Sequence, residues 1–219
     1  MAQIFPRSTN SIFRLLIFGA VFAVGGLAYI VYTVNESAYF TDVNVDRQQP
    51  VPFSHKHHVT DDGLDCRYCH TSVEQSSYAG VPTTHICMSC HSKLWLNSSM
   101  LEPVRASYAT DKSLEWTRVN ALPDFVYFDH SIHVNKGIGC TTCHGPIGEM
   151  PLTRRANTLY MRWCIDCHKH PEGSVRRRED VFKADFVPPP DQLALGRRLV
   201  REYKIKDPKQ LTDCYTCHR

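Results

Sequence analysis

The sequence has little excess of charge of either sign. Its 25 Lys and Arg residues nearly balance 22 Asp and Glu residues, which leaves a formal charge of +3 at pH 7. Proteins that bind nucleic acids through the phosphate backbone carry a clustered basic excess. We therefore predict no nucleic-acid partner. With 219 residues, the chain has room for one domain plus an anchor, or for two small domains.

No cysteine stands alone. The 10 Cys residues form five pairs with one spacing, and His follows the second Cys of every pair. This is the C-x-x-C-H signature of c-type haem attachment, in which two thiols bond to the porphyrin and the His binds the iron. The sequence therefore predicts five haem c groups. Covalent attachment is expected at Cys66, Cys69, Cys87, Cys90, Cys140, Cys143, Cys164, Cys167, Cys214 and Cys217, and proximal ligation at His70, His91, His144, His168 and His218.

Two other roles for the cysteines have to be weighed. The spacing from Cys69 to Cys87, and that from Cys143 to Cys164, would fit a zinc ribbon. Disulfides would fit an oxidising compartment. Neither role explains why His follows every pair, and the fifth pair has no zinc partner. We therefore favour haem.

No charged residue occurs between Leu15 and Val34. This run of about 20 residues spans about 30 Å as a helix, the thickness of bilayer hydrocarbon. Arg7 and Arg14 precede it and Glu36 follows it, which predicts a cytoplasmic N-terminus. A cleaved signal peptide is the alternative, but its apolar region would be shorter and followed by a small-residue cleavage site. We predict a single-pass anchor in the lipid bilayer of the bacterial cytoplasmic membrane, with the haem domain in the periplasm.

An internal repeat organises the rest of the chain. Phe53–Val59 and Phe128–Val134 both read F-x-H-x-x-H-V, and a C-x-x-C-H motif follows each after six and five residues respectively. A further motif follows in each half, so the haems are expected as a pair, a pair and a single. The predicted segments are a cytoplasmic N-terminus (1–14), a transmembrane helix (15–34), a linker (35–52), a first di-haem repeat (53–125), a second di-haem repeat (126–185), and a C-terminal helix with the fifth haem (186–219).

Regular secondary structure is expected to be sparse, because proline-rich stretches such as Pro188–Pro190 interrupt the chain. The clearest helix begins after Asp191 as its N-cap, with Leu195, Leu199 and Tyr203 at spacings of four. So short a chain cannot both bury a large side-chain core and wrap five haems. We predict a multihaem cytochrome c fold: one N-terminal transmembrane helix and a loop-rich, mostly α outer domain whose core is built on five haems.

The distal ligands decide between a carrier and a catalyst. A haem iron with two protein ligands carries electrons, whereas an open sixth position can bind a substrate. The two histidines of each F-x-H-x-x-H segment share a helix face but diverge along it, so they can reach two irons. We predict distal ligation by His55, His58, His130 and His133. For the fifth iron the candidates are Met150 and Met161, whose thioether would raise its potential, with haem-edge packing as the alternative for either.

Several arginines suit haem propionates as bidentate partners. They are Arg154, Arg155, Arg176, Arg177 and Arg178. A solvated basic surface is the other interpretation of this group, and the sequence does not choose between the two.

The residues around the first four motifs resemble a known family. The F-x-H-x-x-H…C-x-x-C-H arrangement resembles the class III multihaem cytochromes c, in which the first His ligates the following haem and the second ligates a different one. From roughly residue 50 to residue 170, the chain further resembles the pentahaem membrane-anchored cytochrome c component of Alternative Complex III. The stretches that carry this resemblance are Phe53–Val59, Asp65–Glu74, Ala79–Pro82, Cys87–His91, Asp129–Gly137 and Trp163–His168.

This resemblance implies an electron-carrier subunit without a catalytic site of its own. Quinol would be oxidised in integral membrane subunits. This chain would take electrons from an iron–sulfur subunit and pass them to a cytochrome c, a soluble carrier or a terminal oxidase. The resemblance also implies distal roles for the four histidines named above, and it does not choose between the two methionines.

Two rival functions stay open. A self-contained membrane-anchored quinol dehydrogenase of the tetrahaem type would have four motifs, the first of them beside the anchor, and this chain departs on both points. A multihaem reductase with an open haem is the second rival. The sequence shows no unusual motif that would favour it, such as a Lys in place of a proximal His.

Overall fold

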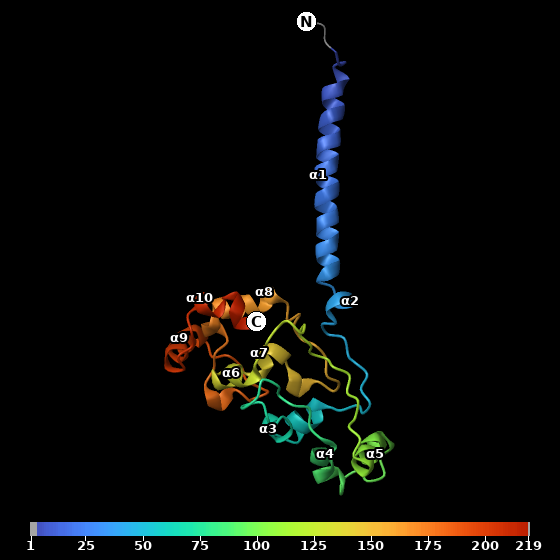
Figure 1. The fold of residues 1–219 in the computed structure, drawn as a ribbon, viewed down its shortest axis with the longest axis vertical. Coiled ribbons are helices and arrows are strands. Elements are labelled where there is room, and N and C mark those ends of the chain that lie inside the picture. Colours follow the sequence, from blue (N-terminus) through green and yellow to red (C-terminus); the bar gives the residue numbers. More distant parts are fainter. Residues whose placement is uncertain (1–3, 219) are drawn as a thin grey trace. The chain divides into compact units, whose positions relative to one another are not determined.

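The computed structural model describes residues 4–218, and the chain divides into two units at Val43 and Asn44. The first unit contains α1 (Ser8–Asn35) and the short α2 (Ala38–Thr41) (Figure 1). α1 has 28 residues, all of them unburied, and it includes the uncharged run seen in the sequence. It is one N-terminal apolar helix, long and apolar enough to cross a membrane by length and composition.

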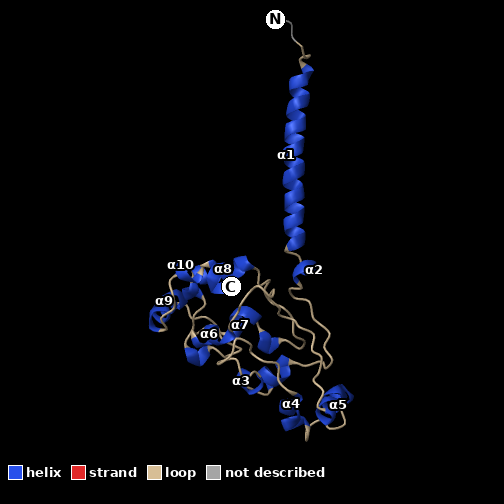
Figure 2. Ribbon diagram, viewed as in Figure 1, coloured by secondary structure: helices blue, strands red, loops and turns tan. Residues whose placement is uncertain are grey.

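The second unit is built from short helices joined by irregular connections (Figure 2). Its α-helices are α3 (Cys66–Cys69), α4 (Thr84–His91), α5 (Glu102–Thr110), α6 (His130–Asn135), α7 (Cys140–His144), α8 (Met161–Lys169), α9 (Gln192–Glu202), α10 (Pro208–Leu211) and α11 (Cys214–Cys217). The other turns are the π-helix η1 (Lys56–Asp61) and the 3-10 helices η2 (Ser99–Leu101), η3 (Ile147–Glu149), η4 (Pro171–Gly173) and η5 (Arg178–Asp180). Within residues 4–218, extended pairing is limited to two isolated bridges, Asp46 with Arg154 and Ile138 with Val175.

The C-x-x-C-H motifs themselves form helical turns. α3, α7 and α11 each begin at the first Cys of a motif, whereas α4 and α8 begin three residues earlier. Before α3 and α11, an Asp caps the turn: Asp65 accepts from the backbone N–H of Arg67, and Asp213 from that of Tyr215. Such caps satisfy N–H groups that the first turn of a helix leaves without partners. The residue before α7 is Gly139, which has no side chain to act as a cap.

Apolar side chains gather in two small clusters of the described chain. Their buried members are Val73, Val134 and Val181 in one, and Val175, Leu199 and Tyr203 in the other. This is little apolar burial for a unit of this length. The expectation that cofactors complete the core stays a prediction.

α9 lies where the spacing of Leu195, Leu199 and Tyr203 predicts a helix, and Leu199 and Tyr203 are buried. The predicted cap is wrong in one respect, because the side chain of Asp191 makes no capping hydrogen bond. Asp191 has φ −96° and ψ 23°, outside the extended region that points an N-cap side chain at the first turn. Its carbonyl accepts from the N–H of Leu195 instead.

Candidate haem sites

Each C-x-x-C-H motif defines one site, and the sites are numbered 1 to 5 along the chain. Both thiols of a motif lie on one helical turn, and all ten cysteines are free thiols. The structure therefore disagrees with the disulfide alternative. The predicted proximal histidines of sites 1 to 5 are, in order, His70, His91, His144, His168 and His218.

The two F-x-H-x-x-H segments hold their rings in the same way. The ring of Phe53 lies edge-on to His55, with 5.0 Å between ring centres and 87° between planes, and stacks on His58 at 4.5 Å and 21°. The ring of Phe128 lies 4.7 Å and 88° from the first His of its segment, and 4.5 Å and 28° from the second. The Phe thus supports both histidines of a segment and directs them apart.

Three of the predicted distal histidines stand opposite a proximal His. The facing pairs are His58 and His91 (6.1 Å between ring centres, 70° between planes), His130 and His144 (6.4 Å, 2°), and His133 and His168 (6.1 Å, 20°). A bond from a metal to an imidazole nitrogen is roughly 2 Å, and that nitrogen lies about 1.1 Å from its ring centre, so two imidazoles on opposite sides of one iron have centres about 6 Å apart. The three pairs have the separation that an iron between them requires.

The fourth predicted distal ligand, His55, lies within electrostatic reach of His70 in site 1 and His144 in site 3. Burial, followed by these neighbours, lowers the pKa of His55 to about 4. Burial, followed by His130 and His70, likewise lowers the pKa of His144 to about 4. Both rings are therefore neutral at neutral pH, which is the form of imidazole that binds a metal.

In nearly all the candidate histidine ligands, the ring nitrogen Nδ1 is within hydrogen-bond distance of another protein group. An Nδ1–H that donates to a carbonyl leaves Nε2 free to bind iron and fixes the orientation of the ring. The Nδ1 atom of His55 lies 3.0 Å from the hydroxyl of Thr153. A backbone carbonyl lies 2.6 to 3.3 Å from Nδ1 in His58, His70, His91, His130, His133, His168 and His218.

Sequence reasoning missed these anchors. His168 is held by the carbonyl of Leu211, and His218 by that of Phe125, both distant along the chain. Every residue has a backbone carbonyl, so no residue type marks the one that will be used. Only Thr153 contributes a side chain, and a single Thr gives no pattern to find.

In the described chain, site 5 lacks a facing pair of imidazoles, as site 1 does. Within residues 4–218, no imidazole makes a ring contact with His218, and the ring in contact with it is that of Phe125, at 5.9 Å. Met150 is only 1% exposed, and its carbonyl accepts from the N–H of Lys56, next to the first F-x-H-x-x-H segment. Met161 is 63% exposed and begins α8, which packs against α10 just before site 5.

The remaining histidines make other contacts. His57 Nε2 lies 3.5 Å from the carboxylate of Asp62, the His85 ring lies edge-on to Tyr108 at 4.8 Å, and His170 lies 3.9 Å from the carboxylate of Glu172. The structure places none of these three opposite a proximal His.

The spatial order of the sites differs from their order in sequence. Thiols of different sites interact in the pairs Cys69 and Cys87, Cys66 and Cys140, Cys143 and Cys167, and Cys164 and Cys217. These interactions connect the sites in the order 2, 1, 3, 4, 5. In Figure 1, α4 lies at one end of the second unit, α7 is central, and α8 and the C-terminus lie at the other end.

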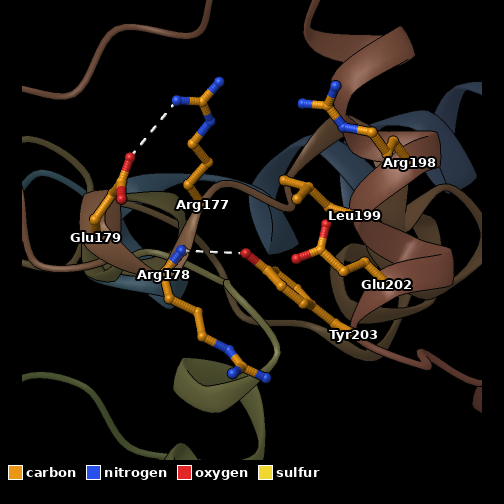
Figure 3. Close-up of a pocket in the computed structure, with 7 residues that line it drawn as sticks. All are labelled: Arg177, Arg178, Glu179, Arg198, Leu199, Glu202 and Tyr203. Carbon is orange, nitrogen blue, oxygen red and sulfur yellow. Dashed lines mark hydrogen bonds and ion pairs between the residues drawn. The ribbon is translucent and has the colours of Figure 1, made fainter.

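A surface pocket is lined by none of the predicted ligands. Its lining residues are Arg177, Arg178, Glu179, Arg198, Leu199, Glu202 and Tyr203 (Figure 3). A guanidinium nitrogen of Arg177 lies 3.6 Å from the carboxylate of Glu179, and the backbone N–H of Arg178 donates to the hydroxyl of Tyr203 at 3.3 Å. The guanidinium of Arg178 is engaged as well, since its Nε donates to the carbonyl of Asn135 at 3.1 Å. Both arginines, considered above for propionates, therefore contact protein groups at the surface.

Comparison with known proteins identifies the cofactor class. Residues 126–219 match the family described as cytochrome c7 and related cytochrome c. They contain the motifs of sites 3, 4 and 5. This part of the chain is a cytochrome c7-like multihaem domain whose cofactor is haem c, and zinc is not needed to explain its cysteines.

The chain is also similar to the multihaem cytochrome c subunit of menaquinone reductase from Nitratidesulfovibrio vulgaris (Hildenborough). The two are 38% identical over 103 residues, or 45% of this chain and 46% of that protein. The chain therefore spans about half the length of this curated relative. Both comparisons relate the chain to cytochromes c, and the relative is a multihaem one.

Proposed function

We propose that this chain is a membrane-anchored pentahaem cytochrome of a quinol-oxidising complex similar to Alternative Complex III. It receives electrons from an iron–sulfur subunit beside the integral membrane subunits and passes them to a cytochrome c, a soluble carrier or a terminal oxidase. α1 anchors it in the cytoplasmic membrane, with the N-terminus inside and the second unit in the periplasm. The similarity to a subunit of a menaquinone reductase supports quinone-reactive partners.

The observation that carries this proposal is the set of facing imidazoles. Their ring centres lie 6.1 to 6.4 Å apart, which suits two axial ligands of one iron. An iron capped on both sides has no position for a substrate, so it exchanges electrons only. We assign His58 to site 2, His130 to site 3, His133 to site 4, and His55 to site 1.

The protein groups have distinct roles at these sites. Each bound haem supplies a centre that gains and loses one electron. The paired thiols hold it covalently, and the Nδ1 hydrogen bonds to backbone carbonyls keep the ligating rings in place. A rigid ligand set changes little between the two oxidation states, which favours electron exchange over chemistry.

At site 5 we propose Met161 as the distal ligand. It lies on the helix that packs against α10, and the Cys164 thiol one turn later interacts with Cys217 of site 5. Met150 is instead buried beside the first F-x-H-x-x-H segment, whose histidines we assign to sites 1 and 2. A thioether ligand raises haem potential relative to imidazole, so Met161→His should lower one of five midpoint potentials and leave the haem content unchanged. A Met161→His titration identical to that of the native protein would reject this assignment.

The proposal is tested on the native assembly, purified in mild detergent with its partners. The pyridine haemochrome spectrum gives the haem-to-protein ratio, which should be five. Low-temperature EPR of the oxidised protein should show low-spin haems only. A stoichiometric high-spin haem that changes on adding nitrite would instead support the reductase alternative.

The curated relative is named as a subunit of a menaquinone reductase. This name favours electron flow in the opposite direction, towards quinone. In that case the chain would deliver electrons to quinone. Two assays on the same preparation separate the directions: reduction of the haems by added quinol, and their reoxidation by a menaquinone analogue after chemical reduction. Quinol oxidation by the chain stripped of its partners would instead indicate a self-contained quinol dehydrogenase.

A further inference from the structure

Arg176 is a buried cation beside site 3. The residue is 4% exposed, and Cys140 and Cys143 of site 3 lie within electrostatic reach of its guanidinium, together with Asp180. Burial lowers the pKa of Arg176 from its ordinary value, but an arginine in a protein stays protonated. A fixed positive charge is therefore held in the interior next to the two attachment thiols of site 3.

Hydrogen bonds hold this guanidinium without neutralising it. Its Nη2 donates to the hydroxyls of Thr141 and Thr142, both at 3.0 Å, and its Nη1 to the carbonyl of Asp180 at 3.4 Å. The Nε atom is buried without a partner. The Asp180 carboxylate is itself paired with Lys183 at 2.7 Å, and no ion pair joins Arg176 to a carboxylate of the described chain. A buried charge without a counter-ion is costly unless something at the site compensates it.

The surrounding chain is shaped to admit this side chain. A methyl group on Gly139 would overlap the guanidinium, and one on Gly137, where φ is +81°, would overlap the carbonyl of Arg176. The ring of Phe186 lies 4.0 Å from the guanidinium carbon, a cation–π contact. The glycines before the third motif therefore leave the space that this charge occupies.

Site 1 has a related arginine in a different electrostatic state. Arg67 lies over the ring of Phe182 at 4.5 Å, much as Arg176 lies over Phe186. Its Nε and Nη2 atoms, however, each donate to the carboxylate of Asp65 at 2.9 Å, and its side chain is 49% exposed. The charge at site 1 is therefore paired and solvated, whereas that at site 3 is neither.

We propose that Arg176 raises the reduction potential of the haem bound at site 3. Reduction adds one electron, and a fixed positive charge in a low-dielectric interior stabilises the added electron more than water-screened charges do. Arg176 does not bind the iron. It acts electrostatically, because it fixes a positive charge close to the haem. The inference rests on the proposed haem at site 3.

The test is Arg176→Gln in the full anchored chain, with haem content measured first and a spectroelectrochemical titration afterwards. One of the midpoint potentials should fall by about 59 mV. For a one-electron couple, this lowers the reduced-to-oxidised ratio of that haem about tenfold at a fixed solution potential. Arg177→Gln is the matched control, since it removes the same charge from an exposed neighbour paired with Glu179 (Figure 3). It should move no potential.

Two further variants separate charge from structure. Arg176→Lys keeps the charge and should leave the potential near its native value. Gly139→Ala keeps the charge but displaces it, and should lower the same potential by less than Arg176→Gln does. Combining Arg176→Gln with His130→Met assigns the affected haem, because both changes should act on one component and in opposite directions.

The outcomes are distinct. A variant Arg176→Gln with its full haem content and native potentials would overturn the inference, and so would an Arg176→Lys variant whose potential falls as far as that of Arg176→Gln. If Arg176→Gln loses haem, Gly139→Ala decides, and unchanged potentials there would again overturn it. A native chain without haem at site 3 would instead count against the proposed function.

Discussion

The first F-x-H-x-x-H segment turns through a π-helix, η1, whereas the second turns through the α-helix α6. Their Phe and His rings nevertheless lie at nearly the same distances, 5.0 and 4.5 Å in one segment and 4.7 and 4.5 Å in the other. The first segment is one residue farther from its C-x-x-C-H motif, and the wider π turn takes up such a residue. The comparison shows that the cluster of three rings is the repeated unit, and the helix type adapts to the chain length.

The same two regions differ in charge. At site 1 the arginine is exposed and bonded to the carboxylate of Asp65, and at site 3 Arg176 is buried without one. Similar ligand sets with different neighbouring charges should have different potentials. Repetition of the rings therefore does not make the two halves equivalent for electron transfer.

The largest expected effect is loss of a distal ligand. His55→Ala and His130→Ala should each convert one haem from low spin to high spin, because each removes one of two axial imidazoles. EPR of the oxidised protein measures this. His57→Ile is the matched control, since it gives the first segment the residue that the second has at that position. If His57→Ile also produced a high-spin haem, the equivalence of the two segments would be wrong.

The next effect concerns the glycines that precede the two motifs. Gly63 and Gly137 have φ of 72° and 81°, but a methyl group at Gly63 would meet nothing within 4 Å. Gly63→Ala should therefore lower the free energy of unfolding by only about 1 kcal/mol, the cost of holding Ala in the left-handed conformation. Gly137→Ala also forces the carbonyl of Arg176 aside, which brings the total to about 3 kcal/mol. Chemical denaturation of both variants measures the difference, and equal losses would contradict the crowding at site 3.

A smaller effect is expected from the caps of the two segments. The Ser54 hydroxyl accepts from the N–H of His57 at 3.1 Å, and the Asp129 carboxylate accepts from that of Ile132 at 3.3 Å. Ser54→Ala and Asp129→Ala should each lower the free energy of unfolding by about 1 kcal/mol. Their carbonyls, which hold the second His of each segment, are unaffected. A loss in one segment alone would show that only that turn depends on its cap.

The smallest difference requires no mutation. The imidazole planes cross at 70° in site 2 but lie within 2° and 20° of parallel in sites 3 and 4. Parallel imidazoles that hold one iron would split the energies of the two iron d orbitals that overlap with their π systems, and crossed imidazoles would largely cancel that splitting. Oxidised site 2 should therefore give a more anisotropic low-spin EPR signal than sites 3 and 4. Selective loss of that signal in His58→Ala would assign it.

Sequence reasoning singled out His58, His130 and His133, whose rings face a proximal His, from residue type and spacing. That they bind iron stays a prediction. Few ring arrangements are possible when two thiols and a His share one turn, or when two His lie three residues apart. The π turn could not be foreseen, since it depends on how one additional residue is accommodated once both ends are fixed. The burial of Arg176 was equally hidden, because it depends on Gly139 and Phe186 meeting it from distant segments. The segment boundaries and the ligand roles proposed above stay predictions.

The hydrogen bonds that hold the proximal rings also determine the order in which the sites can be completed during synthesis. His91 is held by Leu94, and its facing His58 by Ser54, so one short stretch supplies every ring contact of site 2. His168 is held by the carbonyl of Leu211, so site 4 stays unfinished until that residue has been made. A chain emerging from its N-terminus is thus expected to complete one end of the haem series early and the other end late. Maturation factors would then meet the two halves in different states of order.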